Sequence, residues 1–281
     1  MKRARPENSY CSLPNEIYNF QIFLYLSPLE LACLRNTNMF FSQRITKQKI
    51  PNTSYISSVN LLKWSFSCCG FKKTFPICRI AALNGNFEVF KYAIDKGFHK
   101  DNQICINAAR DGYLNILKYA RKKECHWDKY TCYYAATGGY LEIIKYARIN
   151  GCPWDRDVCC AAAASGYLEI LKYLRKYNCP WDKNTCAAAA EYGHFEILKW
   201  AKENGCPWNE ETCSHAALNG HLDILKWTRE HGCPWDVDTC TNAAKNGHIE
   251  VLKWASENGC PWNGETIQAV QNNHKLLKYP Y

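Results

Sequence analysis

The sequence predicts an all-α protein, a helical solenoid of short repeats, from three regularities. Tryptophans recur every 27 residues from Trp127 to Trp262, and glycines recur at the same interval from Gly85 to Gly247. A pair of alanines lies shortly before each of these glycines. A fixed period between 20 and 50 residues is typical of solenoids, in which each unit stacks on its neighbours.

The first half of each unit reads as a short helix. An aspartate or asparagine follows each tryptophan, where its side-chain oxygen is expected to cap a helix start. These residues are Asp128, Asp155, Asp182, Asn209, Asp236 and Asn263. The alanine pair lies at the centre of this helix and favours close approach of neighbouring helices. The glycine is expected to end the helix and to reverse the chain.

The second half of each unit reads as a wider apolar helix. In YLEIIKYARIN (140–150), only Glu142, Lys145 and Arg148 form a polar stripe. Such a surface needs cover on both flanks, as in a helix between stacked neighbours. The Gly-Cys-Pro-Trp segment that follows stops the helix, because proline disfavours helical geometry in the preceding residue. The tryptophan is expected to fold back as an apolar anchor.

The unit resembles the ankyrin repeat in its A-A-x-x-G-H-L-E-I-L-K core and the following G-C-P-W-D/N, best seen in 187–209 and 214–236. The resemblance covers 60–281: a degenerate start (60–74), seven fuller repeats (75–262) and a truncated end (263–281). The ankyrin unit has about 33 residues, so this one is about six shorter. The shortening implies that the projecting hairpin is reduced to a tight turn. The T-P-L-H tetrapeptide is absent, and Cys213 and its equivalents occupy the buried leucine position.

The N-terminal segment departs from the period. Residues 1–10 are expected to be a disordered basic tail, and residues 11–50 a separate helical unit. Its L-P-x-E-I start at 13–17, Y-L-S-P at 25–28, and the following Glu30-Leu31 and Leu34-Arg35 resemble an F-box. That resemblance implies docking on the adaptor subunit of a cullin-type ubiquitin ligase. The implied docking residues are Leu13, Pro14, Ile17, Leu26, Pro28, Leu31 and Leu34.

The combined layout predicts a non-enzymatic substrate receptor, whose repeats bind a target protein while residues 13–45 dock on the ligase. The alternative is a stand-alone ankyrin-repeat module that binds or sequesters a partner, with the same segment serving only as a cap. An F-box ahead of short Cys/Trp-rich repeats resembles proteins encoded by large DNA viruses of protists. The expected location is cytoplasmic, or the host cytoplasm or nucleus for a viral protein.

Target binding is expected where the repeats differ. In ankyrin proteins the two residues after the alanine pair face the concave surface, so the resemblance implies a face formed by a series of such positions. These are Leu83, Asn84, Arg110, Asp111, Thr137, Ala164, Glu191, Tyr192, Leu218, Asn219, Lys245 and Asn246. The helix-start pairs from Lys129-Tyr130 to Glu210-Glu211 are expected to flank this face.

The 18 cysteines do not predict a metal centre. Most repeats give C-x6-C, unlike the short pairs of zinc sites, and buried cysteine behaves as a small hydrophobe. Nor does any Ser/His/Asp set stand out, because every candidate recurs at repeat spacing and a catalytic site is needed only once. We therefore expect no catalytic residues, no metal and no cofactor.

The net charge of +9 is concentrated at the N-terminus: residues 1–75 carry ten Lys/Arg and three Asp/Glu. The remaining residues carry 25 and 23, so a phosphate-neutralising groove in the repeats is not expected and nucleic acid is an unlikely partner. The sequence has no apolar run long enough to span a membrane and no secretory signal at its start. A monomer with mostly reduced thiols is expected.

Overall fold

The computed structural model describes residues 59, 63 and 76–273. Within this part of the chain every regular element is an α-helix, α5 to α19, which confirms the predicted all-α repeat fold. The N-terminal tail, the F-box-like segment and the shortened last helix predicted after residue 273 lie outside the described residues. The chain divides into two compact units, Met1–His126 and Trp127–Tyr281.

The described part of the first unit holds two helix pairs. The first helices of the pairs are α5 (Ile77–Leu83) and α7 (Gln103–Arg110), and the second helices are α6 (Phe87–Asp95) and α8 (Leu114–Lys122). Both first helices contact each other, and each packs on its own second helix. The alanine pairs at 81–82 and 108–109 are buried, which is what brings α5 and α7 together.

The second unit continues the same alternation. Its first helices are α9 (Lys129–Thr137), α11 (Arg156–Ala164), α13 (Lys183–Glu191), α15 (Glu210–Leu218), α17 (Val237–Asn246) and α19 (Gly264–Asn272). Its second helices are α10 (Leu141–Ile149), α12 (Leu168–Lys176), α14 (Phe195–Glu203), α16 (Leu222–Glu230) and α18 (Ile249–Glu257).

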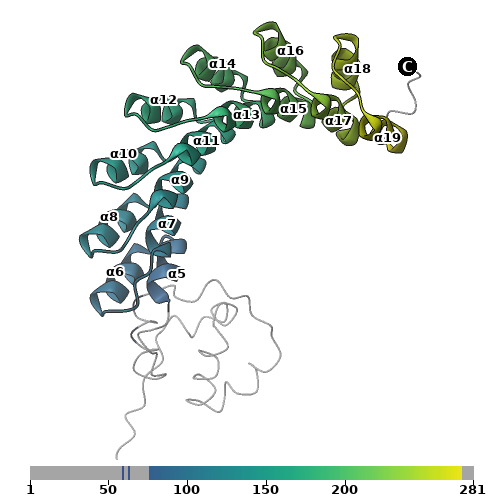
Figure 1. Cartoon of the computed structure of the whole chain (residues 1–281). Helices are drawn as coiled ribbons and strands as arrows, with labels where there is room; N and C mark the ends of the chain where they lie inside the picture. The colour runs from purple at the N-terminus through teal and green to yellow at the C-terminus, as the bar shows by residue number, and fades with distance from the viewer. Residues whose placement is uncertain (1–58, 60–62, 64–75, 274–281) are drawn as a thin grey trace, which may run out of the picture. The chain divides into compact units, whose positions relative to one another are not determined.

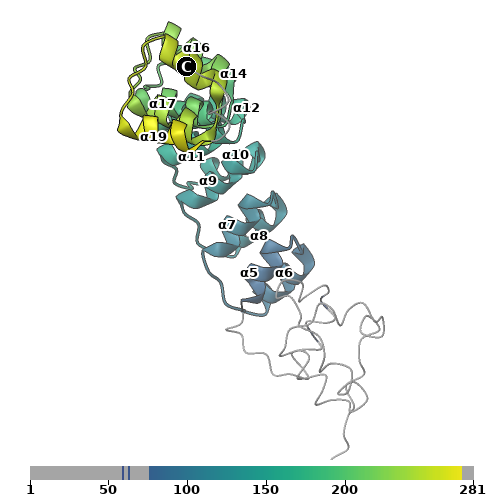
Figure 2. The same ribbon diagram turned by 90° about the vertical axis from the view of Figure 1, so that its right-hand side faces the viewer.

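In this second unit the two kinds of helix form two rows, and the row of first helices lies on the inner side of the bend (Figures 1 and 2). Neighbouring first helices pack closely on one another, whereas the second helices spread apart. The small side chains explain the difference, because the alanine pairs in α9 to α17 are fully buried between adjacent first helices. Ile143, Ile170, Leu198 and their equivalents fill the space between the rows.

Helix caps follow the predicted pattern with one exception. Asp128, Asp155, Asp182 and Asp236 each accept a hydrogen bond from the backbone N–H two residues later. Asn263 accepts one from the Thr266 N–H, as part of a capping box. The prediction is wrong at Asn209, whose side chain makes no cap hydrogen bond. Its amide Nδ2 lies 3.4 Å from Glu210 Oε1 instead.

The turn after each first helix is a point of contact with the next repeat. Gly193 has φ +75°, and the following His194 N–H returns to Ala189 O at 2.8 Å, a helix-ending arrangement. The imidazole of His221, one repeat later, covers this glycine and donates Nε2–H to Glu191 O at 3.1 Å. His194 and His248 make the same bond to Ala164 O and Leu218 O, both at 3.0 Å.

The loop tryptophans are held between successive second helices. The indole of Trp208 has Lys202 Nζ 3.9 Å from its ring centroid and the ring of Trp227 at 5.8 Å, edge to face. Trp181 is flanked in the same way by Arg175 and Trp200, and Trp235 by Arg229 and Trp254. The expected anchoring role is confirmed, and cation–π contacts add to it.

Two glycine substitutions separate the energetic cost of a left-handed backbone from the cost of a clash with the neighbouring histidine. Gly193 and Gly205 both have left-handed backbones, with φ +75° and +82°. A Cβ at Gly193 would lie 2.7 Å from His221 Cε1, but at Gly205 it would meet nothing within 4 Å. We expect Gly205→Ala to lower the free energy of unfolding by about 1 kcal/mol and Gly193→Ala by about 2–3 kcal/mol. Urea denaturation measures both, and equal losses would show that the histidine contact is unimportant.

Candidate protein-binding face

The residues after the alanine pairs lie at the C-terminal ends of the first helices. In the first unit, Leu83 and Arg110 end α5 and α7, and Asn84 and Asp111 are their C-caps. In the second unit, the ends of first helices and their C-caps hold the other predicted residues, namely Thr137, Ala164, Glu191, Tyr192, Leu218, Asn219, Lys245 and Asn246. Whether these positions bind a partner stays a prediction.

Several of these polar groups are engaged inside the protein. Arg110 pairs with Asp111 at 3.1 Å, and Asn219 Nδ2 donates to Glu191 O at 2.8 Å. Lys245 Nζ lies 2.5 Å from Glu265 Oε1. Asn246 donates to the Asn242 carbonyl one turn earlier. Such residues support the turns and the stacking, which reduces what they offer to a partner. Tyr192 differs, because it is 57% exposed.

A second set of face residues lies in the middle of the first helices. In α9, Tyr130, Tyr133, Tyr134 and Thr137 recur at i, i+3, i+4 and i+7, opposite the buried Cys132 and its neighbours. Tyr130 is 48% exposed, and the rings of Tyr133 and Tyr134 meet edge to face at 5.2 Å. The signal is present in the sequence, because the two positions after the helix cysteine differ between copies, from Tyr133-Tyr134 in α9 to Ala187-Ala188 in α13.

The same stripe is built from smaller residues in the next two repeats. In α11 it consists of Asp157, Cys160, Ala161 and Ala164, and in α13 of Asn184, Ala187, Ala188 and Glu191. Among the described cysteines only Cys160 is not fully buried. Of these stripe residues, Ala161, Ala187 and Ala188 are buried, whereas Tyr130 and Tyr192 are exposed, which leaves the aromatic rings and the carboxylates prominent on this face.

Ion pairs connect the starts of successive first helices. Lys129 Nζ lies 2.6 Å from Asp155 Oδ2 and 3.7 Å from Asp157 Oδ2. Arg156 and Lys183 repeat the pattern with Asp182 and Glu211, at 3.2 and 3.0 Å. The predicted flanking positions are therefore in contact between adjacent repeats. Exposed pairs of this kind contribute little to stability individually, so their main effect is to occupy the basic side chains.

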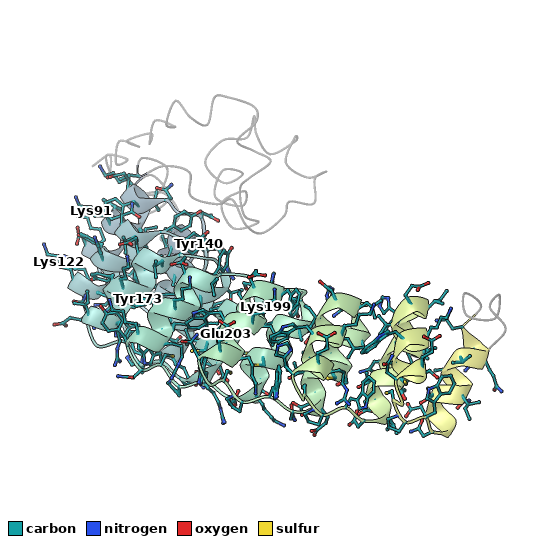
Figure 3. The ribbon with its side chains drawn as sticks, turned by 90° about the horizontal axis from the view of Figure 1, so that it is seen from above. Lys91, Lys122, Tyr140, Tyr173, Lys199 and Glu203 are labelled. Carbon is teal, nitrogen blue, oxygen red and sulfur yellow. The ribbon has the colours of Figure 1, made fainter. Side chains whose placement is uncertain are left out.

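The two rows of the second unit differ in charge. Its first helices with their N-caps carry ten Asp/Glu and four Lys/Arg, whereas the second helices with their C-caps carry eight and ten. On the second helices lysines pair with glutamates three residues earlier, as in Lys145–Glu142 at 2.7 Å. Figure 3 shows Lys199 and Glu203 of α14 among these mixed charges. Only the first-helix row is strongly acidic, which is unfavourable for a phosphate backbone.

The cysteines form two buried columns with structural contacts. Five of the described loop cysteines donate their S–H to the carbonyl of the N-cap residue of the same repeat, as Cys206 does to Asp182 O at 3.4 Å. Cys152, Cys179, Cys233 and Cys260 repeat this bond. Among the described residues, no three His, Cys, Asp or Glu side chains gather in a way that could hold a metal.

Burial lowers the acidity of two of the described thiols, Cys78 and Cys160. It raises the pKa of Cys78 to about 12. Burial, followed by the nearby Asp182, Asp157 and Glu191 carboxylates, raises the pKa of Cys160 to about 11. These thiols are therefore protonated at neutral pH and are poor nucleophiles, since the thiolate is the reactive form.

Comparison with known proteins supports the repeat assignment. Residues 213–255 match the family described as ankyrin repeats (many copies). Together with the helical pairs, this match supports an ankyrin repeat protein, a fold that is typically a non-catalytic binding scaffold. No match was found among curated proteins. Across the described ranges, none of the helices combines the length and apolar character needed to cross a membrane.

The raised thiol pKa values predict a loss of stability at alkaline pH. An unperturbed thiol ionises near 9.0, so the unfolded chain releases these protons before the folded chain does. The stabilisation is complete below pH 9 and declines as the pH rises toward 11. Cys160→Ala should show a smaller decline, and the chain itself places Ala187 at the equivalent position. Denaturation midpoints from pH 7 to 10, under reducing conditions, test this; parallel declines would contradict a contribution from Cys160.

Proposed function

We propose that the chain is a non-enzymatic protein-binding scaffold that serves as a substrate receptor of a cullin-type ubiquitin ligase. The ankyrin repeats support the first part, because such arrays are protein–protein interaction modules. The observation that carries it is the first-helix row of the second unit. Its buried positions repeat from copy to copy, whereas the exposed position near each helix start changes from Tyr130 in α9 to Asp157 in α11 and Asn184 in α13.

The ligase part of the proposal rests on the N-terminal sequence. Residues 13–45 carry the F-box-like pattern, and in this role Leu13, Pro14, Ile17, Leu26, Pro28, Leu31 and Leu34 grip the adaptor subunit. The repeats then hold a target protein for ubiquitin transfer by other subunits. In the viral setting that the domain order resembles, the target is a host protein, and the chain acts in the host cytoplasm or nucleus.

The alternative is a stand-alone ankyrin-repeat module that sequesters its partner without a ligase. The specific observation in its favour is that the stripe residues of α9 to α15 all come from the repeats. Target binding by this face needs no residue of the N-terminal segment. The two functions therefore differ in whether the chain binds the adaptor subunit.

Titration of the full chain with the purified ligase adaptor subunit tests the proposal. We expect saturable binding that Leu13→Asp/Leu26→Asp weakens by about 30-fold or more, because central apolar anchors dominate such interfaces. A matched control, Asn15→Asp/Asn36→Asp, adds the same charge in the same segment outside the implied docking residues. It should change the affinity less than threefold. Absence of binding by a folded wild-type chain would overturn the ligase role and leave the stand-alone module.

A further inference from the structure

The geometry points to a basic, arginine-rich segment of a partner protein as the ligand of the first-helix face of α9 to α15. This inference rests on the proposed protein-binding function and specifies the chemistry of the target. It concerns a surface within the second unit, defined by the stripes of α9, α11 and α13, the equivalent residues of α15 (Glu211, Ser214, His215 and Leu218) and the C-cap Tyr192. We refer to it as the tyrosine face.

The first support is the exposure of aromatic rings on these helices. Tyr130 at the start of α9 and Tyr192 at the end of α13 are 48% and 57% exposed. Tyr133 and Tyr134 lie half-buried on the helix face of α9, in contact with each other. Burial and the nearby Cys160, Tyr134 and Asp157 raise the pKa of Tyr133, and Tyr192 also contributes. The helices α9, α11 and α13 pack side by side, and Cys160 Sγ of α11 lies 3.6 Å from Asn184 O of α13.

The second support is the excess of carboxylates around those rings. With their N-caps, α9, α11, α13 and α15 carry seven Asp/Glu and three Lys/Arg, so carboxylates remain in excess after pairing. Asp157, whose side chain is 55% exposed, shares Lys129 with Asp155, and Glu211 stays 43% exposed beside Lys183. Glu191 Oε2 lies 3.0 Å from His215 Nδ1, but the two are not aligned as a hydrogen bond. The basic groups of the face, Lys129, Arg156 and Lys183, are already paired with acidic groups.

Charge complementarity indicates which kind of segment binds this face. Carboxylates bind guanidinium groups through paired N–H···O bonds, and tyrosine rings attract the same cations on their faces. The protein uses this chemistry internally, where Arg229 Cζ lies 4.1 Å from the ring centroid of Trp235. Arginine fits both kinds of group better than lysine, because its planar cation can stack and pair at once. An acidic or phosphorylated segment would be repelled.

A matched pair of tyrosines tests the location of the site. Tyr192 is the C-cap of the first helix α13, whereas Tyr177, 45% exposed, is the C-cap of the second helix α12. The full chain is titrated with a fluorescent peptide of four arginines separated by Gly-Ser. We expect Tyr192→Ala to weaken binding about fivefold and Tyr177→Ala less than twofold. Equal losses would overturn the location, and unchanged affinity in Tyr192→Ala would overturn the role of the ring.

Two further variants test the chemistry. Asp157→Asn should weaken the peptide about fivefold, and Glu142→Gln, on the second helix α10, less than twofold. Tyr192→Phe should retain the wild-type affinity, because it keeps the aromatic face. Its unfolding midpoint should equal that of the wild-type chain, as a control for the fold. A peptide in which glutamate replaces arginine should not bind. Comparable binding of the glutamate peptide would overturn the inference.

The chain's own basic N-terminus is the competing occupant. Lys2, Arg3 and Arg5 are reversed to glutamate in the full chain, and the peptide titration is repeated. Unchanged affinity supports a separate partner, whereas an increase of tenfold or more would assign the face to the tail of this chain. The adaptor titration is independent of these results. A chain that binds the adaptor but not the peptide keeps the proposed ligase role and loses only this inference.

Discussion

Each repeat depends on its neighbours, because two nine-residue helices are too short to be stable alone in water. Stacking supplies the missing burial. Alanine pairs such as Ala189-Ala190 allow adjacent first helices to touch, and the wide apolar faces of the second helices fill the space between the rows. The histidine bonds then fix the spacing: His221 from one repeat satisfies Glu191 O at the end of the previous first helix. This carbonyl at a helix end, which also accepts from Asn219 Nδ2, thereby becomes the connection between units.

The same constraint creates the binding face. Because stacking consumes one side of each first helix, only the opposite stripe can vary without disturbing the fold. That stripe carries tyrosines in α9, small residues in α11 and α13, and carboxylates along its length. The ion pairs between helix starts use the basic side chains of the row, as in Arg156–Asp182. The remaining charge of the row is negative. The way in which the first helices stack therefore also determines the charge of the ligand that the face favours.

Much of the fold could be predicted from the sequence because its determinants are local. The left-handed glycines, the aspartate caps and the buried cysteines follow from the 27-residue pattern. The exception at Asn209 depends on its neighbour Glu210, which takes its amide. The pairs between repeats could not be predicted, because Lys129 and Asp155 are 26 residues apart and Lys183 and Glu211 are 28 apart. The stripe of Tyr133 and Tyr134 lies outside the predicted positions after the alanines, several of which serve the turns.

Hydrogen–deuterium exchange on the full chain, with and without His221→Ala, tests most directly whether stacking between repeats holds the array together. His221 starts α16 but bonds to the end of α13. The account predicts faster exchange in α13 and α14 as well as in α15 and α16, while amides of α10 keep their protection. An increase confined to the residues around position 221 would contradict it. Each repeat would then be stable by itself, and the coupling described here would not be what holds the face in shape.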